Sequence, residues 1–348
     1  MLLKRLSELN GTSGAEGLVR DFLRQQIEPV VDTILVDKIG NLIATKNGRL
    51  SGPKVMLSAH MDEVALMIVD ITSDGFLKFR SVGGIDARIL VSKAVKINET
   101  LVGVIGAKAI HLQKRSERQR ALHFEQLYID IGAKSKEEAA GKVKLGDYAY
   151  FITKCEPFGE GLYKGKAFDD RVGCAILVEL LKNDYDAPLV AAFTVQEEIG
   201  LRGAKVVAYT LVPDFAIVIE GTVAADVSDR EEEGWVTELG KGPACSLMDR
   251  TALYNPELIQ WVADLAHARK IPLQFRRGTC GGNDAGPIQV SKSGIPTIVL
   301  SVPCRYIHSS VSIISEKDYT ACLNLVAELL KELPRKFGVS SIAKEENV

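Results

Sequence analysis

Four short apolar segments of this chain each lead directly into a histidine or a glutamate. One runs from Leu189 to Val195 and is followed by the adjacent pair Glu197 and Glu198. Runs of this length, bounded by residues such as proline, are typical of buried strands. The other three are residues 55–57, 215–219 and 297–302, which lead to His60, Glu220 and His308. Because ligands of an open α/β sheet bind outside the carboxyl ends of its strands, the pattern predicts one shared polar site.

The segments between these strands predict an α/β domain that carries an insertion. Amphipathic or apolar helices are expected at residues 171–181, 256–269 and 319–333, and their alternation with strands indicates a mostly parallel sheet covered on both faces. Residues 66–157 instead show short alternating segments separated by turn residues, which favours a small β-barrel or sandwich. We therefore predict a discontinuous α/β domain of residues 1–65 and 158–348, with a β-rich unit of residues 66–157 inserted in it.

Two local patterns refine this prediction. Ser13 and Glu16 have the spacing of a capping box in front of a helix whose apolar stripe begins at Leu18. Inside the inserted unit, strands are expected at residues 77–80, 94–97, 101–105 and 148–151, with one weak helix at residues 136–140.

Charge and hydropathy argue against several classes of partner. The chain has 43 Lys and Arg against 45 Asp and Glu, so it offers no basic excess for a nucleic acid or an anionic membrane. No apolar run has the length of a membrane span, and the first residues do not follow the pattern of a signal peptide. The six cysteines are scattered, without a C-x-x-C pair. We interpret them as reduced cysteines of a cytoplasmic protein.

The polar residues at the strand ends are of the types that bind divalent cations. They are His60, Asp169-Asp170, Glu197-Glu198, Glu220 and His308. Imidazole and carboxylate ligands together favour zinc, cobalt or manganese over calcium. Two such cations can activate one water and polarise a carbonyl, while one carboxylate of the glutamate pair stays free to take a proton. Asp62 lies two residues after His60, where it can accept the second imidazole N–H.

Each of these residues also has an ordinary explanation. Acidic residues often solvate a strand end, and a single buried histidine is often structural. The pair Asp169-Asp170 stands before an expected helix, where a carboxylate can act as an N-cap. The convergence of five segments on one edge of a sheet favours the metal site.

With these residues in place, the chain resembles the M42 family of metallo-aminopeptidases over nearly its whole length. The family includes the tetrahedral aminopeptidases, glutamyl aminopeptidase and some relatives labelled endoglucanase. The motifs that carry the resemblance are Thr12-Ser13-Gly14-x-Glu16, Asp37-x-x-Gly40-Asn41, Ala59-His60-Met61-Asp62-Glu63-Val64, Phe168-Asp169-Asp170-Arg171-x-Gly173, Gln196-Glu197-Glu198-Ile199-Gly200, Glu220-Gly221-Thr222, Gly240-Lys241-Gly242-Pro243 and Tyr306-x-His308-Ser309.

The resemblance implies a fold and a set of roles. The fold would be that of the zinc exopeptidases, with an inserted small barrel or PDZ-like dimerisation domain. Two divalent metal ions, zinc or cobalt with manganese as an alternative, would share Asp169 as a bridging ligand. His60 and Glu220 would complete one metal site, and Glu198 and His308 the other. Glu197 would be the general base with Asp62 behind His60, and the glycine-rich loop of residues 281–286 would place Asp284 near the substrate.

This resemblance implies an aminopeptidase that uses two metals to remove N-terminal residues from short peptides, and a homo-oligomer of twelve subunits built from dimers. Three alternatives stay open at this point. A different metal-dependent amidohydrolase, such as a deacylase, fits the same scaffold. A shell-forming or peptide-binding protein with an inactive site would lack a ligand or base, yet every position is filled. A glucanase needs two separated carboxyl groups across a sugar bond, whereas Glu197 and Glu198 are neighbours.

Overall fold

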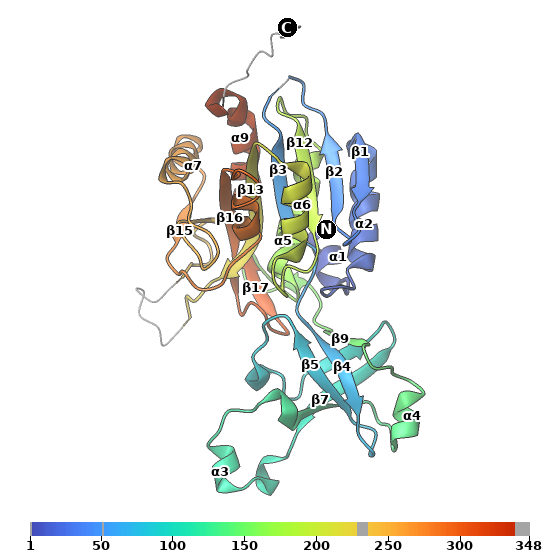
Figure 1. The fold of residues 1–348 in the computed structure, drawn as a ribbon. Helices are drawn as coiled ribbons and strands as arrows, with labels where there is room; N and C mark the ends of the chain where they lie inside the picture. Colours follow the sequence, from blue (N-terminus) through green and yellow to red (C-terminus); the bar gives the residue numbers. More distant parts are fainter. Residues whose placement is uncertain (1, 51, 228–235, 338–348) are drawn as a thin grey trace.

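A wide mixed sheet with helices on both faces and a small closed barrel make up the protein (Figure 1). The computed structural model describes residues 2–50, 52–227 and 236–337. The long path of the sheet has the strand order β1-β2-β12-β3-β13-β16-β17-β11-β10. These strands are β1 (Thr33–Val36), β2 (Leu42–Lys46), β12 (Leu189–Thr194), β3 (Val55–His60), β13 (Phe215–Val223), β16 (Thr297–Arg305), β17 (Ser312–Ser315), β11 (Leu162–Gly165) and β10 (Glu156–Pro157). Two further strands, β14 (Ala244–Ser246) and β15 (Gln274–Arg276), extend the sheet beside β16.

The four central strands are parallel, as the sequence predicted. β12, β3, β13 and β16 follow one another in the sheet, and Thr194 of β12 pairs with His60 of β3. The remaining strands of the long path pair antiparallel on either side of this core. The expected strands therefore end at one common edge. Three of them run further than expected, since β3 continues to His60, β13 to Val223 and β16 to Arg305.

Alternation along the strands divides the core into two layers. In β13, Phe215, Ile217 and Ile219 face the larger apolar cluster, while Ala216 and Val218 face the smaller one. Since side chains in a strand alternate between faces, Glu220 lies on the same face of β13 as Ala216 and Val218. In β3, His60 lies on the same face as Met56, which belongs to the smaller cluster. The periodicity thus places His60 and Glu220 on one face of two neighbouring strands.

Helices cover both faces of the sheet (Figure 1). The larger cluster contains apolar residues of five helices, and the smaller cluster contains those of α6 and α8. The five are α1 (Leu2–Glu8), α2 (Gly17–Ile27), α5 (Phe168–Leu181), α7 (Pro256–Arg269) and α9 (Glu316–Phe337), and the two are α6 (Arg202–Leu211) and α8 (Ala285–Gln289). Among the helices that the structure describes, none is both long and apolar enough to cross a bilayer.

The inserted segment forms a closed antiparallel barrel with the strand order β4-β5-β8-β7-β6-β9. These strands are β4 (Ala65–Ile71), β5 (Leu77–Val82), β8 (Leu127–Asp130), β7 (Leu101–Ala107), β6 (Ala94–Ile97) and β9 (Tyr148–Phe151), and the short helices α3 (Arg115–Arg118) and α4 (Lys136–Ala140) lie between them. The barrel has its own apolar core. The sequence predicted four of its strands and α4 but gave no separate prediction for β4 and β8. We propose it as a separate unit with the predicted limits 66–157, although β10 already pairs in the large sheet.

The predicted capping box at Ser13 and Glu16 is wrong. Helix α2 begins at Gly17 with Glu16 as its N-cap, and no side chain caps it. The Ser13 hydroxyl instead donates a hydrogen bond to Asp62 Oδ2 at 2.5 Å. Glu16 Oε1 accepts hydrogen bonds from the backbone N–H groups of Gly14 and Gln196. Ser13 and Glu16 have the sequence spacing of a capping box, but their side chains form hydrogen bonds with segments that are distant in sequence.

A buried ion pair joins the two ends of the insertion. The Lys166 ammonium lies 2.6 Å and 2.8 Å from the two carboxylate oxygens of Glu63, and it also donates to the Leu9 carbonyl. Arg171 donates to the carbonyls of Met61 and Gly11 from a fully buried position. These contacts fix the segment after His60 against the segment before Asp169, although the barrel separates them in sequence.

Candidate metal centre

Five separate segments bring the predicted ligands to the carboxyl edge of the sheet. His60 is the last residue of β3, Glu220 lies near the end of β13, and His308 follows β16. Glu198 lies in the turn after β12. Asp169 lies at the start of α5, where its own φ and ψ and those of Asp170 are not helical. The regular helix therefore begins near Arg171, as predicted, and the two aspartates directly precede its first regular turn.

One group of contacts centres on His60. Its Nε2 lies 3.2 Å from Asp169 Oδ1 and 3.2 Å from Glu220 Oε1. The His60 side chain is only 2% exposed. Glu197 is next to this group, because its Oε2 lies 4.0 Å from His60 Nε2. Two carboxylates thus lie within hydrogen-bond distance of one imidazole nitrogen.

A second group centres on His308. Its Nε2 lies 3.1 Å from Asp169 Oδ2 and 3.4 Å from Glu198 Oε2. Asp169 therefore takes part in both groups, with Oδ1 towards His60 and Oδ2 towards His308. A carboxylate in this position has the arrangement needed to connect two cations.

Asp170 is a member of the site to which the sequence assigned no role of its own. A ligand atom of Asp170 lies within 4.8 Å of ligand atoms of both His60 and Glu220. Its Oδ2 accepts the backbone N–H of His60 at 3.1 Å, and its Oδ1 accepts the N–H of Gly173. Asp170 thus holds the end of β3 to the start of α5. The only sequence signal was its adjacency to Asp169.

Most carboxyl groups of the site have raised pKa values, whereas those of Asp169 and Asp62 are lowered. Burial raises the pKa of Glu220 to about 8 and that of Glu198 to about 7. Burial and the nearby charges of Glu220 and Asp284 raise the pKa of Glu197 well above its usual range. Burial would also raise the pKa of Asp169, but hydrogen bonds from His308 and His60 lower it. Burying several acids together disfavours their charged forms.

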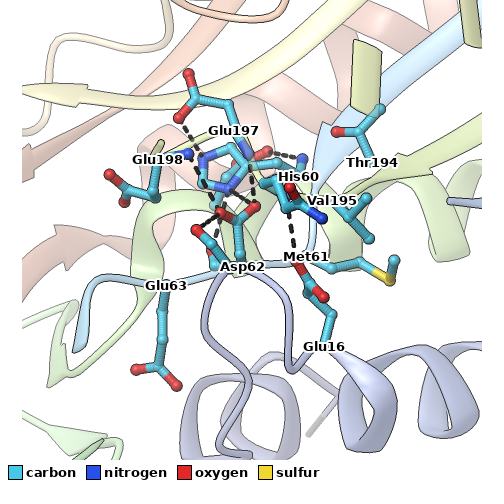
Figure 2. A network of polar contacts seen from close by, with 12 residues as sticks. Glu16, His60, Met61, Asp62, Glu63, Thr194, Val195, Glu197 and Glu198 are labelled. Atoms are coloured by element: carbon cyan, nitrogen blue, oxygen red, sulfur yellow. Dashed lines mark hydrogen bonds and ion pairs between the residues drawn. The ribbon is translucent and has the colours of Figure 1, made fainter. Parts of the chain in front are cut away.

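Asp62 has a wider role than the sequence predicted. Its backbone carbonyl lies 3.0 Å from His60 Nδ1, closer than its carboxylate oxygen Oδ1 at 3.4 Å. The carboxylate mainly accepts the backbone N–H groups of Glu197 and Glu198, at 3.0 Å and 3.2 Å. Figure 2 shows Asp62 beside His60 and this glutamate turn, with Glu63 pointing away from them. Asp62 therefore positions the turn that carries both glutamates.

The donor set fits divalent cations. Two imidazoles and several carboxylates provide nitrogen and oxygen ligands of the kind that zinc, cobalt and manganese accept. Glu220 Oε2 is buried without a hydrogen-bond partner in the part of the chain that the structure describes. A buried carboxylate oxygen is rarely left in this state, because its desolvation is costly. Cations at this edge would offset that cost.

A cleft of about 330 Å³ opens onto the site. His60, Asp169, Glu197, Glu220 and His308 are among the residues that line it. The other lining residues are Gly221, Thr222, Val223, Arg276, Cys280, Gly281, Gly282 and Ile307. Its volume lies in the range of small-molecule and short-peptide sites. Asp284 is 1% exposed and does not line the cleft; its Oδ2 accepts a hydrogen bond from the Thr194 hydroxyl.

Comparison with known proteins agrees with this geometry. Residues 40–325 match the model of the M42 glutamyl aminopeptidase family. The chain belongs to the M42 aminopeptidase family. It is 34% identical over 343 residues to the lysyl aminopeptidase of Pyrococcus furiosus, an alignment that covers 95% of this chain and 96% of that protein.

Solved structures show the same fold. An aminopeptidase from the archaeon Desulfurococcus kamchatkensis superposes with a TM-score of 0.92 at 33% identity, over 98% of this chain and 96% of that one. The TET1 peptidase of Pyrococcus horikoshii superposes with a TM-score of 0.84 at 34% identity, over 95% and 98% of the two chains. This M42 aminopeptidase is therefore a hydrolase of peptide bonds with candidate metal sites of histidine, aspartate and glutamate.

We predict that Asp62→Asn lowers kcat/KM of this aminopeptidase about 10-fold to 100-fold, the usual effect of losing a residue that orients a metal site. The side-chain amide cannot accept both backbone N–H groups of the glutamate turn as the carboxylate does. The measurement is the hydrolysis rate of an aminoacyl 4-nitroanilide. Ser13→Ala is the matched comparison, since it removes one donor to Asp62 and should cost less. Unchanged kcat/KM in folded Asp62→Asn would contradict this role.

Proposed function

We propose that this aminopeptidase uses two divalent cations to remove N-terminal residues from short peptides. His60, Asp169 and Glu220 would hold one cation, and Asp169, Glu198 and His308 the other. The single observation that supports this most is that the two oxygens of Asp169 contact different imidazoles. Zinc or cobalt suits the ligands best, and manganese is the alternative.

Bound cations would supply Lewis-acid polarisation of the scissile carbonyl and a lower pKa for the attacking water. Glu197 is proposed as the general base, because it lines the cleft and its Oε2 is 4.0 Å from His60 rather than within hydrogen-bond distance. A raised pKa lets a carboxylate accept a proton near neutral pH and pass it on to the leaving amine. Asp62 would hold the Glu197 backbone during this transfer.

Recognition of the substrate's α-amino group is proposed to depend on acidic charge. Glu197 lies in the cleft, and Asp284 lies behind it with one carboxylate oxygen free of hydrogen bonds among the described residues. Because Asp284 is almost fully buried, we propose that its charge acts across Glu197 and not by contact. A positively charged amine would be stabilised at this end of the cleft.

Metal removal tests the proposal. Hydrolysis of leucine 4-nitroanilide should disappear after dialysis against a chelator and return when zinc or cobalt is added, since the water would lose its activation. The alternative activities are measured beside it. Acyl-amino acids are the substrates for a deacylase and cellulose for a glucanase. Full peptide activity in a sample verified to be metal-free would exclude the two-cation proposal.

We predict that Glu197→Gln and Asp169→Asn fail for different reasons. Glu197→Gln should keep its metal content but lose about a hundredfold to ten-thousandfold in kcat, since an amide cannot take a proton. Asp169→Asn should lose metal, because it removes the ligand shared by both groups. Elemental analysis and kcat are measured on both variants, with the surface variant Glu179→Gln as the control. Equal metal loss in both would overturn the assignment.

We also propose that the chain assembles through the barrel. The relatives include a TET1 peptidase described as assembling into a tetrahedron or a large octahedral shell. In this chain Val102, Val104, Ile110 and Leu112 of the barrel segment are 48–69% exposed. Exposed apolar residues grouped in this way often mark interfaces. A dodecamer built from dimers is the proposed assembly, and the six unpaired cysteines support a reducing, cytoplasmic location.

The assembly is tested by light scattering at working concentration. The wild type should have about twelve times the 37.9 kDa mass of one chain. Charged substitutions at the exposed barrel positions, Ile110→Glu with Leu112→Glu, should give smaller particles because they place charge in the proposed interface. Leu18→Glu on α2 is the control. A monomeric wild type that still trims peptides fully would show that this chain does not assemble as proposed.

A further inference from the structure

Arg276 is a charged residue of the active-site cleft to which the metal chemistry assigns no task. It is the last residue of β15 and lines the cleft together with His60, Glu197 and Glu220. The remaining lining residues outside the two histidines and three acidic residues are uncharged. Arg276 therefore adds a permanent positive charge to a cleft whose other ionisable side chains are imidazoles and carboxylic acids.

The guanidinium of Arg276 is held by neutral acceptors. Nε donates to Thr222 Oγ1 at 3.1 Å, Nη1 donates to the Gly278 carbonyl at 2.7 Å, and Nη2 donates to the Cys280 carbonyl. Within residues 2–50, 52–227 and 236–337, no carboxylate forms an ion pair with it. Because a guanidinium has five N–H groups, two remain for another ligand. Its position is fixed while its charge is not neutralised.

The location of Thr222 sets the distance between this charge and the ligands. Thr222 and Glu220 are two residues apart in β13, so they lie on the same face of the strand about 7 Å apart. Glu220 contacts His60 and Thr222 contacts Arg276. The guanidinium is thus about one residue of substrate away from the cluster of candidate metal ligands. A planar guanidinium is well suited to a carboxylate, which it can bind through two parallel hydrogen bonds.

The geometry points to Arg276 as a carboxylate-binding residue that sets the substrate preference of this aminopeptidase. The proposal rests on the peptidase function proposed above and names the class of substrate, peptides that carry a carboxylate within one residue of the scissile bond. That carboxylate belongs either to an acidic N-terminal side chain or to the C-terminus of a dipeptide. A purely structural Arg276 would only hold residues 278–280 in place, and the test separates these roles.

The test compares substrates that differ only in this carboxylate. Glutamyl 4-nitroanilide is measured against glutaminyl 4-nitroanilide, and the dipeptide Leu-Ala against Leu-Ala amide. The metal-supplemented wild type should favour the carboxylate form of at least one pair by about tenfold or more in kcat/KM, the scale of a hydrogen bond to a charged group. The pair that shows the preference identifies the source of the carboxylate. Equal rates within both pairs would overturn the proposal.

Three variants assign the preference to Arg276. Arg276→Gln should bring the two members of the preferred pair to similar kcat/KM, and its effect on leucine 4-nitroanilide should be smaller than its effect on the carboxylate substrate. Arg276→Lys should keep part of the preference, since it retains the charge but not the two-pronged geometry. The neighbouring Arg277→Gln should keep all of it. Equal loss on every substrate in Arg276→Gln, with the ratio preserved, would show a structural role and overturn the proposal.

A binding measurement keeps this test separate from the peptidase proposal. Calorimetry compares the α-amide of glutamic acid with the α-amide of glutamine, and Leu-Ala with Leu-Ala amide, on wild type and Arg276→Gln. Tighter binding of a carboxylate form, lost in the variant, supports the subsite even if no peptide is cleaved. No difference between the forms would overturn it even in an active peptidase.

Discussion

The cost of burying acidic side chains at the end of a parallel sheet governs this structure. Each carboxylate taken out of water needs compensation from hydrogen-bond donors or cations. Asp62 receives that compensation from the Ser13 hydroxyl and from the backbone of the glutamate turn. Asp170 receives it from the His60 and Gly173 backbone N–H groups. The hydrogen bonds that compensate these two carboxyl groups also fix the positions of the candidate cation ligands beside them. The same contacts therefore both stabilise the buried acids and organise the site.

The sequence predicted the site better than its surroundings. His60, Glu198, Glu220 and His308 follow apolar strands whose carboxyl ends must coincide in a parallel sheet, so their convergence follows from local pattern alone. The support of the site depends on tertiary contacts that no local pattern contains. Ser13 has the spacing of a helix cap, yet its hydroxyl bonds with a residue 49 positions away. Arg276 stands in a polar segment, and only the pairing of β15 with β14 brings it to the cleft.

The insertion is attached at the edge of the sheet that carries the candidate site. The chain leaves β3 at His60 and enters the barrel at Ala65, and it returns through β11 directly before Asp169. The Glu63–Lys166 ion pair closes this junction, with both side chains about 3% exposed. The barrel is thus connected to the rest of the protein through the two segments that carry His60 and Asp169. A change in the orientation of the barrel would therefore shift the segments that carry His60 and Asp169.

This placement of the insertion also has a consequence for how the chain folds. Thr194 of β12 contacts Ala59 of β3, yet the two residues are 135 positions apart. Several barrel strands pair with near neighbours in sequence, as β4 does with β5 and β6 with β7, and such contacts have a smaller loop-closure cost. We therefore expect the barrel to form early and to shorten the effective distance between β3 and β12. The central strands can then pair, and the edge that carries the candidate cation ligands is completed among the last parts of the native structure.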